Sequence, residues 1–558
     1  MQFFEEHIRK ILAKHTKAAP GAFRLEIPPS QEFGNYALPC FSLTKIAKSA
    51  PSAIAKDLHE KILPDEIIER TEVKGPYLNF FIRQALFAEK IIQLIQTNEF
   101  RRVPRKNNTV MVEFFHANTH KAVHIGHIRN ICLGESLSRI LEQRGSTVIR
   151  VNYQGDIGPH VAKCLYGLLH SKEKPPLRHR GVWLGKVYSR AHELAKDPKV
   201  QEELRTINKN LYAGDPKIIK LWKKTRKYCL DDFEELYREF DVKFKRLYFE
   251  SEVEKHGIEL AKHLLAEGIA KESEGAVIVD LKSYGLSVYV LLTKDKHAVY
   301  HTKDLALAEL KAKEYPRVDL SIHVVGKEQE LYFRQLFKTF ELINSPMKGK
   351  SHHVIYGLVM LPEGKMSSRE GTVVLYDDLI QTMLKRASQE VAKRHSWTKK
   401  KIDASAKAIA FGALKYSMLS RENNREIIFD WDTALSFEGE TGPYIQYAYA
   451  RICSILRKCK RGAKPNFGLL NSEKELGLLS ALAGFPGAVE HAAQNYSPHT
   501  VANYAYTVAK AFSEFYTSNR VIQEDKALEA ARISLITSTK AVLEESLRLL
   551  GITAPQEM

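Results

Sequence analysis

The sequence predicts an α/β protein in which a doubly wound parallel-sheet (Rossmann-like) catalytic domain lies between an α+β N-terminal domain and an all-α C-terminal bundle. Three observations support this fold class. The chain has 558 residues, which is enough for several domains at about 150 residues each. Strand–helix–strand patterns occur twice in its middle, and helical periodicity runs almost unbroken from Val374 to Ile552.

The N-terminal part, residues 1–104, is expected to form the α+β domain. It opens with an amphipathic helical pattern and ends in GPYLNFFIRQALFAEKIIQLI, which is typical of a Gly-Pro turn, an apolar strand and a helix. The polar stretch from Arg101 to Asn108 then indicates a linker.

Residues 105–383 carry the two parallel units. A buried strand is expected from Thr109, a helix from His124 to Arg144 that stops at Gly145, and a second strand in TVIRVNY. The second unit consists of helical DLALAELKAKEY from Asp304, the strand DLSIHVVG and the helix EQELYFRQLFKTF. Two such units predict one doubly wound sheet.

A mixed, highly charged stretch separates the two units. Residues 181–292 are expected to be an insertion, which includes a helix from Pro216 to Asp241. Residues 384–558 are expected to form the helical bundle.

The charge balance indicates a polyanionic partner. Lys and Arg number 84 and Asp and Glu 66, so the excess is 84 − 66 = +18. Nucleic acid is the favoured partner, and the alternative is a basic but unspecialised surface. The six cysteines form no CxxC pair, which argues against a structural zinc site.

Neither a targeting segment nor a membrane span is visible. The longest clearly apolar uncharged stretch, Leu476 to Val489, has 14 residues, whereas a membrane helix needs about 20. A cytoplasmic protein that does not enter a membrane is therefore expected.

The sharpest local motif is His124-Ile125-Gly126-His127, at the junction of the first strand and helix. Two imidazoles at i and i+3 lie on one face of the first helical turn, where free amides attract phosphate, and Gly126 lets a flat ligand approach. By composition HxGH is expected about 0.04 times in this chain. The alternatives are a pair of helix-capping histidines and, with less support, a zinc pair.

A second motif, Lys365-Met366-Ser367-Ser368-Arg369, lies in a glycine-flanked cationic loop after the strand HVIYGLVM. Such a loop can close over a triphosphate and withdraw, although alone it could be a basic surface turn.

At these two motifs the chain resembles class I aminoacyl-tRNA synthetases, which carry HIGH and KMSKS signatures. The resemblance narrows to the arginyl-tRNA synthetase family through EFFHANTHKAVHIGHIRN, YHTKDLALAE, VVGKEQELYFRQLF, GKMSSREGTVV and FDWDTALSFEGETGPYIQYAYARICSIL, in this order. QEFGNYALPCFSLTK and GPYLNFF are similar to the extra N-terminal domain of that family. The inserted stretch aligns least.

The resemblance implies a phosphate site with one substitution. Ser368 stands where the usual pattern has a lysine, and the family commonly places a lysine three residues before HIGH, here Lys121. A cation is needed to stabilise the phosphate in the transition state. The implied catalytic residues are Lys121, His124, His127 and Lys365, and the implied ATP site adds Gly126, Met366, Ser367 and Ser368. Ala117 and His120 depart from the more usual Pro and Ala.

The resemblance also implies an arginine pocket. A guanidinium offers five donors in a planar fork, so a selective pocket needs carboxylates and neutral acceptors. Tyr300 and Asp304 match the guanidinium site, Glu113 and Asn118 match positions that hold the α-amino and carboxylate ends, and Gln329 matches a further pocket position. Without the resemblance, Asp304 could be a helix N-terminal charge and Tyr300 a packing residue.

The implied reaction is that of an arginine-tRNA ligase. L-arginine attacks the α-phosphate of ATP with Mg²⁺ present, and the arginyl group then passes from the adenylate to the terminal adenosine of tRNA(Arg). In the family, the first step usually requires bound tRNA. A monomer is expected.

The aromatic residues Phe437, Tyr444, Tyr447 and Tyr449 are interleaved with Arg451, Arg457 and Lys458, on what is expected to be the first helix of the bundle. Such residues can stack on unpaired tRNA bases, although each could instead be core or solvated surface. Two other functions stay open: a HIGH-bearing nucleotidyltransferase that acts on a small acid without RNA, and a non-catalytic tRNA-binding relative.

Overall fold

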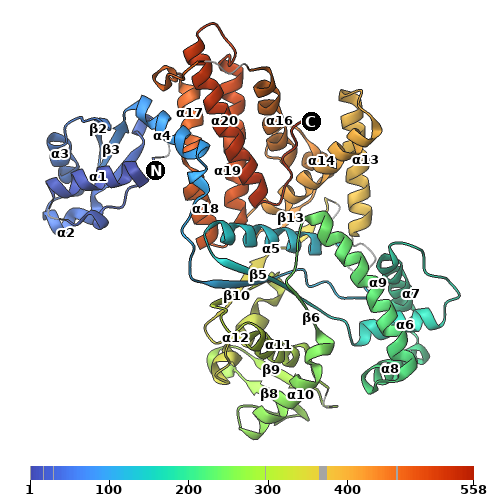
Figure 1. Ribbon diagram of the computed structural model, residues 1–558. Coiled ribbons are helices and arrows are strands. Elements are labelled where there is room, and N and C mark those ends of the chain that lie inside the picture. Colours follow the sequence, from blue (N-terminus) through green and yellow to red (C-terminus); the bar gives the residue numbers. More distant parts are fainter. Residues whose placement is uncertain (1, 17, 29–30, 296, 363–373, 460–462) are drawn as a thin grey trace.

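The computed structural model describes residues 2–16, 18–28, 31–295, 297–362, 374–459 and 463–558. A parallel sheet lies at the centre, a helical bundle lies on one side of it, and the N-terminal domain stands apart beside the bundle (Figure 1). The three predicted fold types are confirmed.

The N-terminal domain is an α+β unit. Its three-stranded antiparallel sheet has the order β1-β3-β2, with β1 at Tyr36–Pro39, β2 at Ile68–Lys74 and β3 at Tyr77–Ile82. The predicted Gly-Pro turn joins β2 to β3, and Gly75 has φ +57°. The helices of this domain are α1 (Gln2–His15), α2 (Thr44–Ala47), α3 (Pro51–Lys61) and α4 (Gln84–Gln96).

The central sheet is parallel throughout, in the order β11-β10-β4-β5-β6. Its strands are β4 (Thr109–Glu113), β5 (Thr147–Gln154), β6 (Arg246–Phe249), β10 (Leu320–Gly326) and β11 (Ser351–Tyr356). The order reverses at β4, which pairs with β10 on one side and β5 on the other. In open parallel sheets a ligand crevice forms at such a switch point, beyond the carboxyl ends of the strands.

The helices that begin at this edge of the sheet carry several of the predicted site residues. The predicted helix from His124 is α5 (Ile125–Gln143), and His124 is its N-cap. The helix predicted from Asp304 begins earlier, since α11 spans Tyr300–Glu314. The other helices of this part are α6 (Pro159–Leu169) and α12 (Glu330–Leu342).

The stretch predicted as an insertion is only partly one, because β6 lies inside it and pairs with β5. This strand has four residues, too few to stand out within a charged stretch. The remainder comprises α7 (Arg180–Leu194), α8 (Pro198–Ala213), α9 (Pro216–Phe240), α10 (Glu250–Ala266) and an antiparallel sheet of β7 (Lys271–Ser273), β8 (Ala276–Asp280) and β9 (Val288–Leu292).

The C-terminal part is mostly helical. Its short strand β13 (Ile427–Ile428), between α14 and α15, pairs with β12 (Val359–Met360), which precedes this part. Its helices are α13 (Tyr376–Arg394), α14 (Lys399–Leu419), α15 (Trp431–Leu435), α16 (Gly442–Lys458), α17 (Glu473–Ala483), α18 (Phe485–Gln494), α19 (Pro498–Ser518) and α20 (Lys526–Leu549). The helix α16, expected to be the first of the bundle, therefore follows α13 and α14, and Phe437 lies outside it. No helix in the described ranges is long and apolar enough to cross a membrane.

Candidate active site

The two histidines of the HIGH motif lie at the N-terminus of α5, directly beyond β4. Their ring centroids are 3.8 Å apart. The Nδ1 atom of His124 accepts a hydrogen bond from the Gly126 backbone N–H at 3.2 Å, and Nδ1 of His127 accepts one from the His124 N–H at 3.2 Å. A Cβ at Gly126 would lie 3.0 Å from the His124 ring, so glycine permits this cap.

These contacts fix the protons on the two rings. Because each Nδ1 is an acceptor, the proton of each neutral imidazole is on Nε2, which is left as a donor. Burial lowers the pKa of His124 to about 4, with a further contribution from Lys121. Burial also holds the pKa of His127 well below its usual value, and nearby His124, His116 and Lys121 lower it further. Both rings are therefore neutral donors at pH 7.

Lys121 lies three residues before this pair. Its Nζ lies 5.6 Å from the centre of the Tyr188 ring on α7. Burial lowers the pKa of Lys121, as does Lys163, while Glu250 opposes this shift. Since Lys121 also depresses the pKa of both HIGH histidines, its charge acts at the end of α5.

The predicted loop residues Lys365, Met366, Ser367 and Ser368 lie outside the described residues. Both described flanks of the loop are attached to α5. After the loop, the Val374 carbonyl accepts a hydrogen bond from the Ile125 N–H at 3.2 Å, and the Tyr376 N–H donates to the Val123 carbonyl at 2.9 Å. Before it, the buried Arg129 side chain donates to the Gly357 carbonyl at 2.6 Å.

A second cluster surrounds Asp304, the fifth residue of α11. One of its carboxylate oxygens accepts a hydrogen bond from the Tyr332 hydroxyl. The other, Oδ1, is buried and has no hydrogen-bond partner among the described residues. Burial raises the pKa of Asp304 to about 7; Glu113 also raises it, against the effect of Tyr332. The Tyr300 side chain is 52% exposed, and its ring lies 4.9 Å from that of Tyr332.

Glu113, predicted to hold an end of the substrate, is only 3% exposed at the carboxyl end of β4. One carboxylate oxygen is paired with Lys311, and the other lies 3.0 Å from Nδ1 of His323. The pKa of Glu113 is lowered because these partners outweigh the cost of burial. Both oxygens of Glu113 are thus already engaged by side chains of the protein.

Asn118 lies in the segment between β4 and α5. Its Oδ1 accepts a hydrogen bond from the Gly155 N–H at 3.2 Å, after β5. A Cβ at Gly155 would lie 2.3 Å from this oxygen and 3.1 Å from Oε1 of Glu250. Gly155 thus lets two side chains approach one backbone position. Gln329 is exposed, beyond the carboxyl end of β10.

Glu250 is a site residue that the sequence analysis missed. It begins α10, and its carboxylate pairs with Lys303 at 2.9 Å. Its charge acts on both clusters, because it contributes an upward shift to the pKa of Lys121 and to the pKa of Asp304. No local motif marks it.

The described residues offer no protein cage for a metal ion, because no group of three or more His, Cys, Asp or Glu side chains among them could hold one. Mg²⁺ commonly binds through substrate phosphates and only one or two carboxylates.

The doubly wound sheet with a HIGH pair at its switch point defines the chain as a class I aminoacyl-tRNA synthetase. A family model described as tRNA synthetases class I (R), catalytic domain, matches residues 90–431. The Arginyl tRNA synthetase N terminal domain matches residues 2–82, and the DALR anticodon binding domain matches residues 445–558. The chain belongs to the arginyl-tRNA synthetases.

Similar proteins match this chain over nearly its whole length. An arginine–tRNA ligase of Clostridium perfringens is 36% identical over 547 residues, which cover 96% of each chain. One of Bdellovibrio bacteriovorus is 34% identical and covers 95% of this chain and 93% of the relative. The structure of the Thermus thermophilus arginyl-tRNA synthetase superimposes with a TM-score of 0.84 at 27% identity, covering both chains completely.

Proposed function

We propose that the crevice beyond β4 and β5 activates L-arginine with ATP and passes the arginyl group to the terminal adenosine of tRNA(Arg). The observation that carries this proposal is the free Oδ1 of Asp304, a buried acceptor without a described partner. A buried carboxylate oxygen of this kind matches the charged, forked donor set of a guanidinium.

Side-chain roles follow from charge and position. Asp304 and Tyr300 would receive the guanidinium, with Glu250 close by. A lysine substrate lacks the planar fork and would leave a buried acceptor without a hydrogen bond. The lost binding free energy would favour arginine over lysine. Asn118 would bind the α-amino or α-carboxylate end of the arginine substrate, away from its guanidinium. Gln329 would border the pocket. Glu113 would support the floor of the pocket through Lys311.

The phosphate side consists of neutral donors and one cation. The Nε2–H groups of His124 and His127, the free amides of α5 and the Lys121 ammonium would stabilise charge that develops on the α-phosphate as pyrophosphate leaves. Mg²⁺, bound to the triphosphate, would neutralise part of its charge. Lys365 and the adjoining Met366, Ser367 and Ser368 would close over the nucleotide, and the attachment of both described flanks to α5 supports this role.

The C-terminal part carries a groove that suits unpaired bases. It is lined by His395, Trp397, Lys401, Tyr447, Arg451, Arg457, Tyr516 and Arg520. The Arg451 guanidinium lies 4.5 Å from the centre of the Tyr447 ring and 5.0 Å from that of Tyr516. Rings and cations together favour base stacking. Tyr449, in contrast, is a core residue, only 2% exposed.

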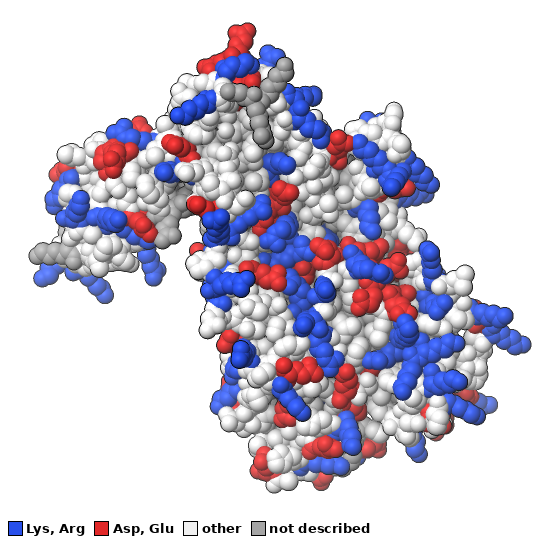
Figure 2. Space-filling view, viewed as in Figure 1, with Lys and Arg blue, Asp and Glu red and all other residues white. Residues whose placement is uncertain are grey.

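A basic face would meet the tRNA backbone. Figure 2 shows Lys and Arg side chains gathered over the region of α6 to α9. The helix α9 itself carries the exposed residues Lys217, Lys220, Lys223 and Lys224. Such contacts with phosphates weaken steeply as salt rises.

The proposal also includes a monomeric, cytoplasmic enzyme without structural zinc, divided at residues 104 and 383. Light scattering of the purified chain tests the monomer, and zinc analysis tests the metal content. Limited proteolysis followed by mass spectrometry tests the domain bounds, because exposed linkers are cleaved first.

A charging assay with bulk tRNA and each of the twenty amino acids in turn tests the function. Arginine alone is expected to be transferred. ATP–pyrophosphate exchange that runs equally well without tRNA, together with no charging, would favour the nucleotidyltransferase reading. Binding of tRNA without charging or exchange would favour the non-catalytic relative.

A further inference from the structure

His120, directly before Lys121, has an unusual backbone conformation and is fully buried. Its φ is +64°, in the left-handed region, and its exposed fraction is 0%. A non-glycine residue adopts this conformation at a cost, so its surroundings must hold it there.

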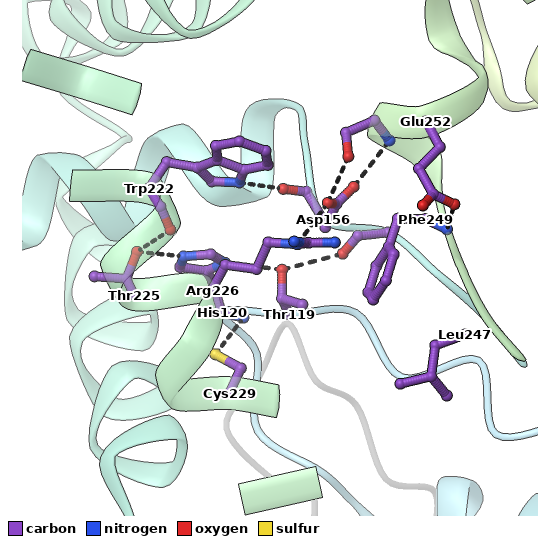
Figure 3. Close-up of polar contacts among 12 residues, drawn as sticks. Thr119, His120, Asp156, Trp222, Thr225, Arg226, Cys229, Leu247, Phe249 and Glu252 are labelled. Atoms are coloured by element: carbon purple, nitrogen blue, oxygen red, sulfur yellow. Dashed lines mark hydrogen bonds and ion pairs between the residues drawn. The ribbon is translucent and has the colours of Figure 1, made fainter. Parts of the chain in front are cut away.

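The contacts that hold His120 come from α9 (Figure 3). Its Nε2 lies 2.8 Å from the Thr225 hydroxyl, and its backbone N–H donates to Sγ of Cys229 at 3.1 Å. On the other side, Nδ1 lies 2.9 Å from the Thr119 hydroxyl, which donates to the Gly155 carbonyl at 3.3 Å. The imidazole thus links α9 to the loop after β5.

Two arrangements of protons fit these contacts, because the Thr225 hydroxyl also lies 3.0 Å from the Leu221 carbonyl and 3.1 Å from the Trp222 carbonyl. Either Thr225 donates to Nε2 of His120 and Nδ1–H donates to Thr119, or Thr225 donates within α9 and Nε2–H donates to the Thr225 oxygen. Burial lowers the pKa of His120 to about 3, and His160 and Arg226 contribute to this shift. The ring is therefore a neutral linker throughout the working pH range.

The helix α9 is itself anchored to the sheet next to this link. The Trp222 indole N–H donates to the Asp156 carbonyl at 2.7 Å, and Nε of Arg226 pairs with the Asp156 carboxylate at 2.8 Å. That carboxylate also accepts from the Ser251 hydroxyl at 2.7 Å, beside Glu250. Thr225 lies between these two anchor residues on α9, so its hydroxyl has a fixed position.

A second helix of the same region supports the residue after Lys121. A Cβ added at Gly185 of α7 would lie 2.9 Å from the Ala122 side chain, so α7 packs directly on this loop. The ammonium of Lys121 lies over Tyr188 of the same helix. The loop is held between α7 and α9, and its most specific polar contact is Thr225 with His120.

We propose that Thr225 and His120 are positioning residues that set the backbone before Lys121 and thereby place its ammonium at the HIGH pair. This inference rests on the proposed function, in which Lys121 supplies the cation that Ser368 does not. The effect passes through the backbone, since neither positioning residue touches a reacting atom.

The test compares two changes at one position. Thr225→Val keeps the shape and removes the hydroxyl, whereas Thr225→Ser keeps the hydroxyl. Arginine-dependent ATP–pyrophosphate exchange with tRNA present is measured for each. Thr225→Val is expected to lower kcat about tenfold with KM for arginine nearly unchanged, because small misplacements of a catalytic group slow chemistry. Thr225→Ser is expected to match the wild type.

A double-mutant cycle separates positioning from general structural support. If Thr225 acts through Lys121, Thr225→Val has less than about a twofold effect in a Lys121→Met protein. Should Thr225→Val fail to fold, His120→Asn takes its place, because Asn tolerates left-handed backbone but cannot reach Thr225 in the same way.

The outcomes are distinct. Wild-type kinetics for Thr225→Val, an equal loss in Thr225→Ser, or the same loss with Lys121→Met present would overturn the positioning role and leave the proposed function standing. A wild-type protein without arginine-dependent exchange would overturn the proposed function itself, and this inference with it.

Discussion

The Tyr332 hydroxyl donates to one carboxylate oxygen of Asp304 and leaves the other, Oδ1, without a described partner in a buried site. The first oxygen is held by the protein and the second is available to a ligand. Because burial raises the pKa of Asp304 to about 7, the free site stands close to half-protonated at neutral pH. Arginine binding and the loss of this proton are therefore coupled.

The coupling predicts a pH-dependent affinity for arginine. Below about pH 7 Asp304 must lose a proton before it can pair with the guanidinium, so KM for arginine is expected to rise up to about tenfold per pH unit. Measurement of KM between pH 5.5 and 8 tests this. Tyr332→Phe removes a contact that lowers the pKa of Asp304, so it is expected to move the break to higher pH. A flat KM profile in the wild type would contradict the coupling.

Asp304 also predicts an unusual stability effect. Its pKa rises from 3.8 to about 7 on folding, so between these pH values the folded protein keeps a proton that the unfolded chain releases. The free energy of unfolding therefore falls as pH rises through this window. Asp304→Asn does not titrate, and at pH 8 it is expected to exceed the stability of the wild type by about 4 kcal/mol.

Thermal unfolding without ligand at pH 8 and near pH 4 measures this difference. The advantage of Asp304→Asn is expected to shrink to about 0.5 kcal/mol near pH 4, where the wild-type carboxyl is protonated in the folded state and about half protonated in the unfolded chain. Saturating arginine is expected to raise the melting temperature of the wild type and not that of the variant. A variant less stable than the wild type at pH 8 would show that Asp304 is already compensated within the free protein.

The sequence supports prediction of the site only where its residues follow one another closely. The HIGH pair lies in one helical turn, and Tyr300 and Asp304 lie four residues apart on another helix. Local patterns and the family resemblance therefore marked these residues. Glu250 comes from another segment and belongs to no motif. Tyr332 lies within VVGKEQELYFRQLF, but nothing in that segment marks its contact with Asp304. The strand β6 was missed for a related reason, since four residues are too few to give a clear period.

His120 shows that an unusual residue can be visible in the sequence although its function is not. Its departure from the usual residue is visible in the sequence, but its partner Thr225 lies 105 positions away. Only the folded α9 brings the two together. Local sequence therefore shows where a chain is unusual, while tertiary packing shows what the unusual residue does.

Gly126 predicts a steric effect at the phosphate site. A Cβ there would lie 3.0 Å from both Nδ1 and Cε1 of His124, so Gly126→Ala must displace the ring or the cap. A loss of about 10²-fold in kcat of exchange is expected, the size seen when one donor to developing charge is removed. Gly487→Ala is the control, because α18 has open space there and alanine favours a helix. Equal kinetics of the two variants would remove the steric argument.

Lys121 predicts a charge effect that can be separated from general electrostatics. Lys121→Met keeps the aliphatic stem and is expected to lower kcat of exchange by about 10²- to 10³-fold, because a group that stabilises transition-state charge is lost. Lys163→Met is the matched control: this lysine is close enough to lower the pKa of Lys121, yet it contacts His192 at 3.0 Å instead of the HIGH pair. Equal losses in both variants would assign the effect to the overall field.

Tyr447 predicts a separate contribution from the C-terminal groove. Its hydroxyl accepts a hydrogen bond from Arg451 at 2.7 Å, and its ring lies beneath the same guanidinium. Stacking of a base on an aromatic ring contributes about 1–3 kcal/mol, so Tyr447→Ala is expected to raise KM for tRNA at least fivefold, while Tyr447→Phe keeps the ring and changes it little. Steady-state aminoacylation with varied tRNA measures this, and KM for arginine at saturating tRNA serves as the internal control. If Tyr447→Phe loses as much as Tyr447→Ala, the hydrogen bond to Arg451 and not the ring surface carries the contact, and the stacking interpretation of the groove is wrong.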